Sequence, residues 1–104
     1  NVYVSATNMG ASAEVWIDRV PGDLVGEIHL AGHRPDAALG DVLLIDSHDS
    51  PVAEPVWALY RRLIERIGPR PTLIERDGDV PGFSDLLAEQ ARAAAVLTDL
   101  EMAA

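Results

Sequence analysis

Hydrophobic and polar positions along the chain alternate between a helical and a strand-like period. The clearest helix has apolar residues at three- and four-residue steps from Val56 to Ile67, with Pro55 in its first turn and Gly68-Pro69 after its end. Short apolar runs bounded by turn residues predict strands. In chain order the predicted elements are a helix at about 9–20, a strand at about 24–31, a loop from Gly32 to Gly40, a strand at about 41–46, the helix ending at Ile67, a strand at about 71–75 and a helix at about 83–100.

Strands that alternate with helices predict an α/β fold of parallel βαβ units with right-handed connections. The strands are nearly continuous apolar runs, which is typical of strands covered on both faces. A TIM (β/α)8 barrel needs eight strands and roughly 250 residues, whereas this chain has 104 residues and supplies about three strands and the tail of another. We therefore predict one domain over residues 1–104, formed by the last three or so βα units of a larger barrel.

Acidic and histidine side chains follow three of the apolar runs. Alternate residues of a strand share one face, so each cluster should direct two side chains the same way. These pairs are Glu27 with His29, Asp46 with His48, and Glu75 with Asp77. Active sites of such barrels lie at the carboxyl ends of the strands, which is where the clusters fall. We therefore predict that they converge on a metal site.

Composition and charge narrow the function classes. The chain has no cysteine, which excludes disulfides, thiolate metal sites and cysteine nucleophiles and fits a cytoplasmic protein. A formal net charge of −9 argues against nucleic-acid partners, because phosphate binding needs a basic surface. No apolar run is long enough to cross a bilayer, so no membrane partner is expected. The chain begins at Asn1 without an initiator methionine, which we interpret as a start inside a larger protein or a processed terminus.

Two of the clusters have structural alternatives to metal binding. His29 could be a hydrogen-bonded core histidine within its strand, although the second cluster of the same pattern favours a ligand. Asp46 and His48 could instead cap the helix expected near Pro51, because an aspartate before a helix accepts backbone N–H groups. We assign that capping role mainly to Asp49 and keep Asp46 and His48 as ligands.

Glu75 follows two apolar residues, where an uncompensated carboxylate is costly, so it requires a cation. The cation could be a metal or an arginine in an ordinary ion pair. Arg76 is excluded from that pair, because adjacent strand residues point to opposite faces. His33 lies in a loop beside Arg34, and a solvated role and a functional role both remain open for it.

The predicted ligands are imidazoles and carboxylates, which suit iron, manganese or zinc, and no soft ligand favours copper(I). Such ligands bind metal in their deprotonated form, so affinity should fall as the pH falls through the histidine range. Carboxylates commonly orient ligating histidines, and Glu27, Asp49 or Asp77 could do so here.

Several sequence motifs occur in a familiar order. They are Asn1-Val2-Tyr3-Val4-Ser5, Gly26-Glu27-Ile28-His29-Leu30-Ala31-Gly32-His33, Ile45-Asp46-Ser47-His48-Asp49, Pro55-Val56-Trp57-Ala58-Leu59-Tyr60 and Thr72-Leu73-Ile74-Glu75-Arg76-Asp77. In these motifs the chain resembles the multinuclear non-heme iron-dependent oxidative enzymes, an uncharacterised bacterial protein family that includes the iron enzyme of methanobactin biosynthesis. The resemblance implies a TIM barrel close to the sugar-isomerase type.

The resemblance also implies a function. Family members hold two or three iron ions at the strand ends, and the matching ligand positions here are His29, Asp46, His48 and Glu75. Relatives use dioxygen to oxidise cysteine residues of ribosomally made precursor peptides, often with a separate substrate-recruiting partner protein. His33 and Asp77 are the candidates for assisting proton transfer. Asn1 matches the end of an aspartate-asparagine motif that faces the metals.

Two further hypotheses come from other classes. One is a sugar isomerase or epimerase on the same type of barrel, which uses a divalent metal without oxygen. The other is a non-catalytic fragment that lacks a complete metal site. A partial barrel leaves strand edges and an apolar surface unpaired, so we also predict self-association or association with the missing half.

Overall fold

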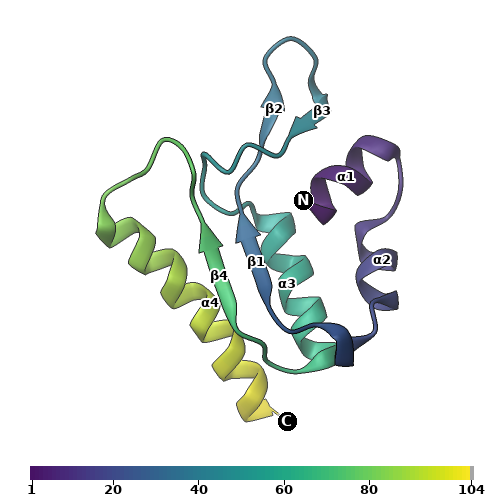
Figure 1. Cartoon of the computed structure of the whole chain (residues 1–104), viewed down its shortest axis with the longest axis vertical. Helices are drawn as coiled ribbons and strands as arrows, with labels where there is room; N and C mark the ends of the chain where they lie inside the picture. Colours follow the sequence, from purple (N-terminus) through teal and green to yellow (C-terminus); the bar gives the residue numbers. More distant parts are fainter. Residues whose placement is uncertain (104) are drawn as a thin grey trace.

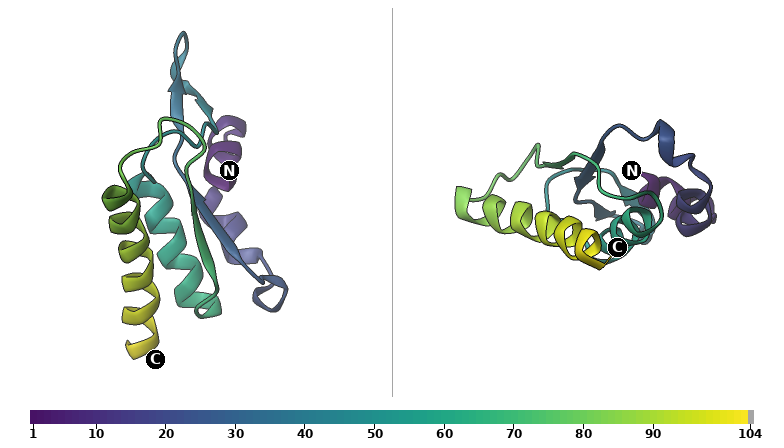
Figure 2. Two further views of the ribbon diagram at one scale, coloured as in Figure 1. Left: turned by 60° about the vertical axis from the view of Figure 1, so that its left-hand side comes forward. Right: turned by 90° about the horizontal axis from the view of Figure 1, so that it is seen from below.

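The computed structural model describes residues 1–103 and is built around a two-stranded parallel sheet (Figure 1). In chain order the elements are α1 (Val2–Met9), α2 (Ala13–Arg19), the short 3-10 helix η1 (Gly22–Leu24), β1 (Ile28–Ala31), β2 (Arg34–Asp36), β3 (Gly40–Ile45), α3 (Glu54–Ile67), β4 (Thr72–Glu75) and α4 (Phe83–Ala103). Strands β1 and β4 form the parallel sheet, and α3 and α4 lie side by side along it (Figure 2). The predicted α/β arrangement of parallel strands and helices is therefore confirmed, and it is compatible with part of a barrel.

The register of the parallel sheet divides its residues between two faces. Leu30 of β1 lies opposite Ile74 of β4, and both pack in the core beneath α3 and α4. The buried members of this core are Leu30, Val52, Trp57, Tyr60, Ile64 and Ala93. His29 and Glu75 occupy the alternate positions of the same two strands, so they lie on the face turned away from α3 and α4.

The helix predicted at about 9–20 forms as α2, and α1 precedes it over Val2–Met9, where no helix was predicted. Gly10 ends α1 in the left-handed conformation with φ 70°, and its N–H bonds back to carbonyl groups of the last turn. Ser12 then starts α2, because its hydroxyl accepts a hydrogen bond from the N–H of Val15. None of the helices within residues 1–103 combines the length and the apolar composition that crossing a bilayer requires.

The strand predicted at about 41–46 exists as β3, but it does not join the parallel sheet. It pairs antiparallel with β2, a strand that forms within the segment predicted as a loop. The turn between them forms because the Asp36 carboxylate accepts the N–H groups of Ala38 and Leu39, each at 2.9 Å, and Gly40 adopts φ 61°. All three predicted strands form, but among the described residues only β1 and β4 pair in parallel, so the prediction was wrong for the pairing of β3.

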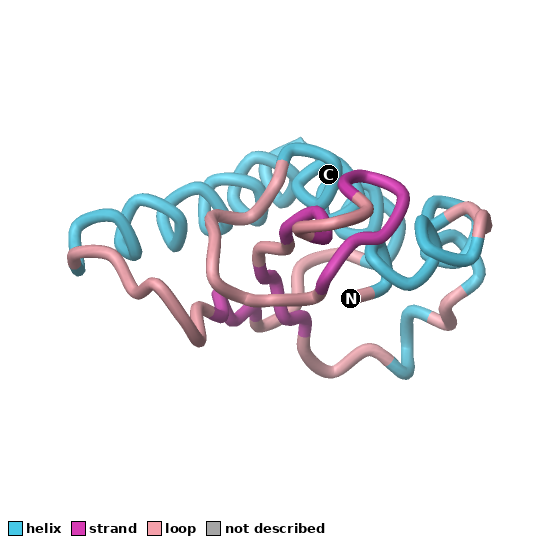
Figure 3. The backbone as a smooth tube through the Cα atoms, turned by 90° about the horizontal axis from the view of Figure 1, so that it is seen from above, coloured by secondary structure: helices cyan, strands magenta, loops and turns pink. Residues whose placement is uncertain are grey.

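The edge of β3 that does not pair with β2 is taken up by α1. The Asn8 side chain donates to the carbonyl of Leu44 at 2.9 Å and accepts from the N–H of Leu44 at 2.8 Å. One amide side chain thus makes the two bonds that a neighbouring strand would make. This contact attaches α1 to the hairpin, which extends beyond the carboxyl ends of β1 and β4 (Figure 1) and lies nearest the viewer when the molecule is seen from above (Figure 3).

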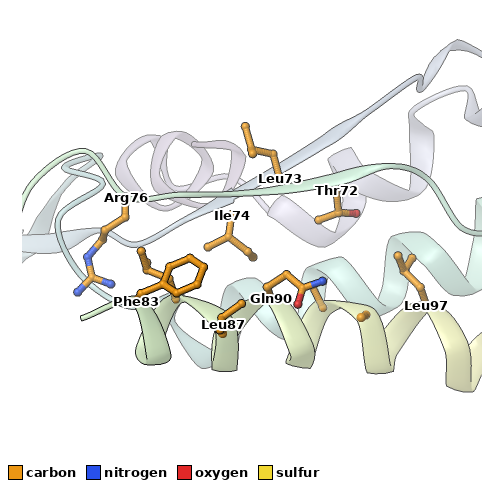
Figure 4. A pocket seen from close by; sticks show the side chains of 11 residues that line it. Thr72, Leu73, Ile74, Arg76, Phe83, Leu87, Gln90 and Leu97 are labelled. Atoms are coloured by element: carbon orange, nitrogen blue, oxygen red, sulfur yellow. The ribbon is translucent and has the colours of Figure 1, made fainter. Parts of the chain in front are cut away.

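A groove of about 410 Å³ lies between β4 and α4 (Figure 4). Its lining is largely apolar and includes Leu73, Ile74, Phe83, Leu87 and Leu97. Phe83 and Leu87 are large apolar side chains with exposed fractions of 73% and 48%. Exposed apolar surface of this kind promotes association.

We expect the chain to self-associate at low micromolar concentration, because burial of this groove removes apolar surface from water. Sedimentation velocity of the wild type measures the association. Leu87→Glu, inside the groove, should weaken it, whereas Ala95→Glu adds the same charge to an exposed position outside the groove lining and should not. A compact monomer for the wild type at that concentration contradicts the expectation.

Candidate metal centre

β1 and β4 place the first two candidate ligands side by side. Glu75 is the last residue of β4 and lies opposite Ala31, two positions beyond His29 on the same face. The Nδ1 atom of His29 is 2.5 Å from Oε1 of Glu75. His29 is 49% exposed and Glu75 is 24% exposed. The alternative that His29 is a core histidine is therefore wrong.

His48 comes from the loop between β3 and α3, and backbone hydrogen bonds hold it between the two strand ends. Its N–H donates to the carbonyl of Gly32, just after β1, at 3.0 Å. Its own carbonyl accepts from the N–H groups of Asp77 at 2.7 Å and Gly78 at 3.3 Å, just after β4. His48 has φ 52°, in the left-handed region that non-glycine residues seldom occupy.

Glu75 joins the two histidines. Its Oε1 atom faces His29, and its Oε2 atom is 3.1 Å from Nδ1 of His48. Two more carboxylates contact His48: Asp77 Oδ2 lies 3.1 Å from Nδ1 and Asp46 Oδ1 lies 2.9 Å from Nε2. These five residues, His29, Asp46, His48, Glu75 and Asp77, are called the strand-end cluster below.

Glu27 extends the strand-end cluster at its outer side. Its Oε1 atom is 2.6 Å from Nε2 of His29. Both ring nitrogens of His29 and of His48 therefore face carboxylates. This is the arrangement in which neighbouring acids orient an imidazole.

The carboxylates change the proton affinity of both histidines. The hydrogen bond to Glu27 is the main cause that raises the pKa of His29, and Glu75 adds to it. Partial burial by itself lowers the pKa of His48, but the charge of Asp46 and the hydrogen bonds to Asp77 and Asp46 outweigh burial and raise it. Both imidazoles thus hold their protons to a higher pH than a free histidine does.

The donor atoms are arranged so that a cation fits. His48, Glu75 and Asp77 each offer a ligand atom, and these atoms all lie within 4.8 Å of one another. One imidazole nitrogen and two carboxylate oxygens suit iron, manganese or zinc. His29 contacts Glu75, and Asp46 contacts His48. These two residues could therefore complete the coordination of one ion or of adjacent ions.

His33, the other candidate for proton transfer, makes no side-chain hydrogen bond to the strand-end cluster within the described residues, although the charge of Asp46 acts on it. Its ring packs against Tyr3, with ring centroids 5.2 Å apart. Its Nδ1 atom is buried and has no hydrogen-bond partner among the described residues. Burial is the main cause that lowers the pKa of His33, so this ring favours its neutral form.

The capping role assigned to Asp49 is wrong. α3 begins at Glu54, later than expected, and its N-cap residue Ala53 makes no side-chain cap bond. Asp49 instead lies beside Arg34, with 3.6 Å between Oδ2 and Nε. The capping alternative for Asp46 and His48 fails for the same reason. Asn1 lies near the strand-end cluster, its backbone nitrogen 3.9 Å from Oδ1 of Asp46.

The side chains facing Glu75 are histidines, and no arginine pairs with it among the described residues. Arg76 points the other way, as the strand alternation predicted. Its side chain is 9% exposed, and its guanidinium lies 3.6 Å from Glu89 of α4. The ion-pair alternative for Glu75 is therefore not supported by the structure.

We expect metal binding to tighten as the pH rises from about 6 to 8, because the raised pKa values mean that His29 and His48 must release protons to coordinate an ion. The folding stability of the metal-free chain should change in the opposite direction with pH. The stability that its imidazolium–carboxylate pairs contribute is fully present below the unfolded pKa of about 6.5 and is lost as the pH rises through the raised values.

Titration with Zn²⁺ or Mn²⁺ in weak buffer measures both the affinity and the protons released. Release of about one proton for each coordinating histidine is expected on the acidic side of that range. An affinity that stays constant between pH 6 and 8 contradicts this expectation.

Comparison with known proteins identifies the family of the chain. Residues 1–98 match the family profile described as the RiPP precursor modification enzyme MbnB/TglH/ChrH, where RiPPs are ribosomally made peptides modified after translation. The chain belongs to the MbnB/TglH/ChrH family. This match confirms the resemblance inferred from the sequence motifs. It covers the strand-end cluster entirely.

Similar proteins carry the name UPF0276 protein. One from Caulobacter sp. (strain K31) is 61% identical over 98 residues, which cover 94% of this chain and 35% of the relative. One from Caulobacter vibrioides is 62% identical over 97 residues, and one from Bordetella parapertussis is 54% identical over 98 residues. The chain thus spans about a third of the length of the curated relatives it matches.

Proposed function

We propose that the chain is part of a multinuclear iron-dependent oxidative enzyme that uses dioxygen to modify cysteine residues of ribosomally made peptides. Family membership supports the peptide-modifying class. The contact of both Glu75 oxygens with two different histidines is the observation that carries the metal assignment. Glu75 and the two histidines would together hold ions of a multinuclear centre, which would supply Lewis-acid and redox chemistry there.

The proposed ligands are His29, Asp46, His48 and Glu75. Two or three iron ions in the longer protein would supply redox chemistry and open coordination positions for substrate and oxygen. Glu27 would orient His29 through the 2.6 Å contact with Nε2. The proposed fold of the longer protein is a TIM barrel of the sugar-isomerase type, and residues 1–104 would form its carboxyl-terminal part.

His33 and Asp77 are proposed to hold and move protons. The lowered pKa of His33 keeps its ring neutral, so its buried Nδ1 atom can accept a proton. Asp77 is 71% exposed and contacts Nδ1 of His48, so it can pass protons between solvent and that histidine. The proposed partners are a precursor peptide and a substrate-recruiting protein, and the proposed location is the cytoplasm.

Anaerobic reconstitution with Fe²⁺ tests the metal assignment. We expect the chain to retain iron after desalting, measured by elemental analysis, and to develop visible absorption on exposure to air. Retention of Mn²⁺ or Co²⁺ without any oxygen-dependent change would favour the isomerase type of chemistry. Failure to retain any of these metals at micromolar concentration would contradict the proposal and favour a fragment without a complete centre.

The substrate class is tested separately in the longer protein. A cysteine-containing precursor peptide encoded beside the gene should change mass only when iron-loaded protein and dioxygen are both present. A matched peptide with serine in place of each cysteine is the control. Equal mass changes in both peptides would contradict cysteine as the modified residue.

A further inference from the structure

Gly32 makes the closest backbone approach next to the strand-end cluster. It follows β1 and is buried. A Cβ atom at this position would lie 2.0 Å from the backbone oxygen of Ser50 and 2.5 Å from its hydroxyl oxygen. Because the nearer atom belongs to the backbone, no side-chain rotation can relieve such a clash. Only a residue without a side chain lets the loop after β3 lie this close to the end of β1.

This close approach allows two hydrogen bonds between the loop and the end of β1. The N–H of His48 donates to the carbonyl of Gly32 at 3.0 Å. The hydroxyl of Ser50 donates to the carbonyl of His33 at 2.9 Å. The loop is thereby attached to two consecutive carbonyl groups just beyond the strand.

The other side of the loop is held by the end of β4, through the bonds from Asp77 and Gly78 to the carbonyl of His48. A Cβ atom on Gly78 would lie 3.3 Å from Cβ of Asp49, which is tight but not forbidding. His48 is thus held from both strand ends, and its left-handed backbone turns the ring toward Glu75.

We propose that Gly32 is a positioning residue of the metal centre, whose missing side chain lets His48 reach Glu75. The inference rests on the proposed function only in naming the ligand set. The role assigned to Gly32 is indirect, because a glycine has no side chain that could bind a metal. The sequence signal was the glycine between Ala31 and His33, directly after a cluster-bearing strand.

The test compares Gly32→Ala with Gly82→Ala, a control in which the added Cβ has no atom within 4 Å. In the metal-free chain, amide hydrogen exchange at His48 and Asp77 should accelerate about 10-fold or more in Gly32→Ala, while exchange within α3 stays unchanged. Affinity for Zn²⁺ or Fe²⁺ should fall about 10- to 100-fold, as for other losses of ligand orientation.

Unchanged exchange and unchanged affinity in Gly32→Ala would overturn the inference. If Gly32→Ala loses protection throughout the chain, the milder Gly78→Ala decides, because it pushes the same loop from the β4 side and should show the same local acceleration to a smaller extent. Equal exchange in Gly78→Ala and Gly82→Ala would then overturn the inference. If the wild type binds no metal, the proposed function fails, whereas the exchange comparison still decides the role of Gly32.

Discussion

Replacing Glu75 by glutamine should lower the affinity for metal by at least about 100-fold, the upper end of what loss of a supporting carboxylate costs. The physical reason is that Glu75 alone among the described side chains contacts both histidines of the strand-end cluster. Glutamine keeps the shape but removes the charge, and it presents one acceptor oxygen where the carboxylate presents two.

Competition of the protein with a chelator for Zn²⁺ or Fe²⁺ measures this change. Glu65→Gln is the matched control, because Glu65 is an exposed residue of α3 whose ion pair within the described residues is the i,i+4 pair with Arg61. Surface pairs of that kind contribute little. Equal affinities for Glu75→Gln and Glu65→Gln would remove Glu75 from the ligand set.

His48→Ala should lower the metal affinity by at least about 100-fold. Loss of a ligand should cost at least as much affinity as loss of a residue that only orients a ligand. His48 is the residue on which Asp46, Glu75 and Asp77 converge. Its loss removes the imidazole ligand and leaves three carboxylates close to one another without a cation between them.

Metal content after reconstitution and desalting measures the effect of His48→Ala. His33→Ala is the control for loss of an imidazole, since the His33 ring packs against Tyr3 and its Nδ1 atom has no hydrogen-bond partner among the described residues. Retention of metal by His48→Ala at the level of His33→Ala would refute the assignment of His48.

The elements that local periodicity determines were predictable from the sequence. α3 and the two parallel strands lie close to where the apolar spacing placed them, and the strand alternation correctly separated Glu75 from Arg76. Helix α1 was missed, because Val2-Tyr3-Val4 is β-branched and aromatic and shows no helical stripe. Its helical state depends on packing of Val4 and Ala6, which are buried.

The hairpin and the connections within the site could not be predicted from local patterns. β3 has the apolar run of a core strand, but the Asn8 amide at its edge and the turn at Asp36 direct it into the hairpin. Alternation within one strand predicted that Glu27 and His29 share a face. It could not show that Glu75 reaches two histidines, because that depends on where the loop carrying His48 crosses the strand ends.

Because Glu75 and Arg76 point to opposite faces, they also favour the observed register of β4 against β1. Glu89 of α4 accepts the N–H of Val52 at 2.8 Å and lies 3.6 Å from the Arg76 guanidinium beneath the sheet. Sliding β4 by one residue would exchange the two side chains, sending an acid toward Glu89 and a guanidinium toward two imidazolium rings. Both encounters join like charges, so electrostatic repulsion penalises the slipped pairing on either face.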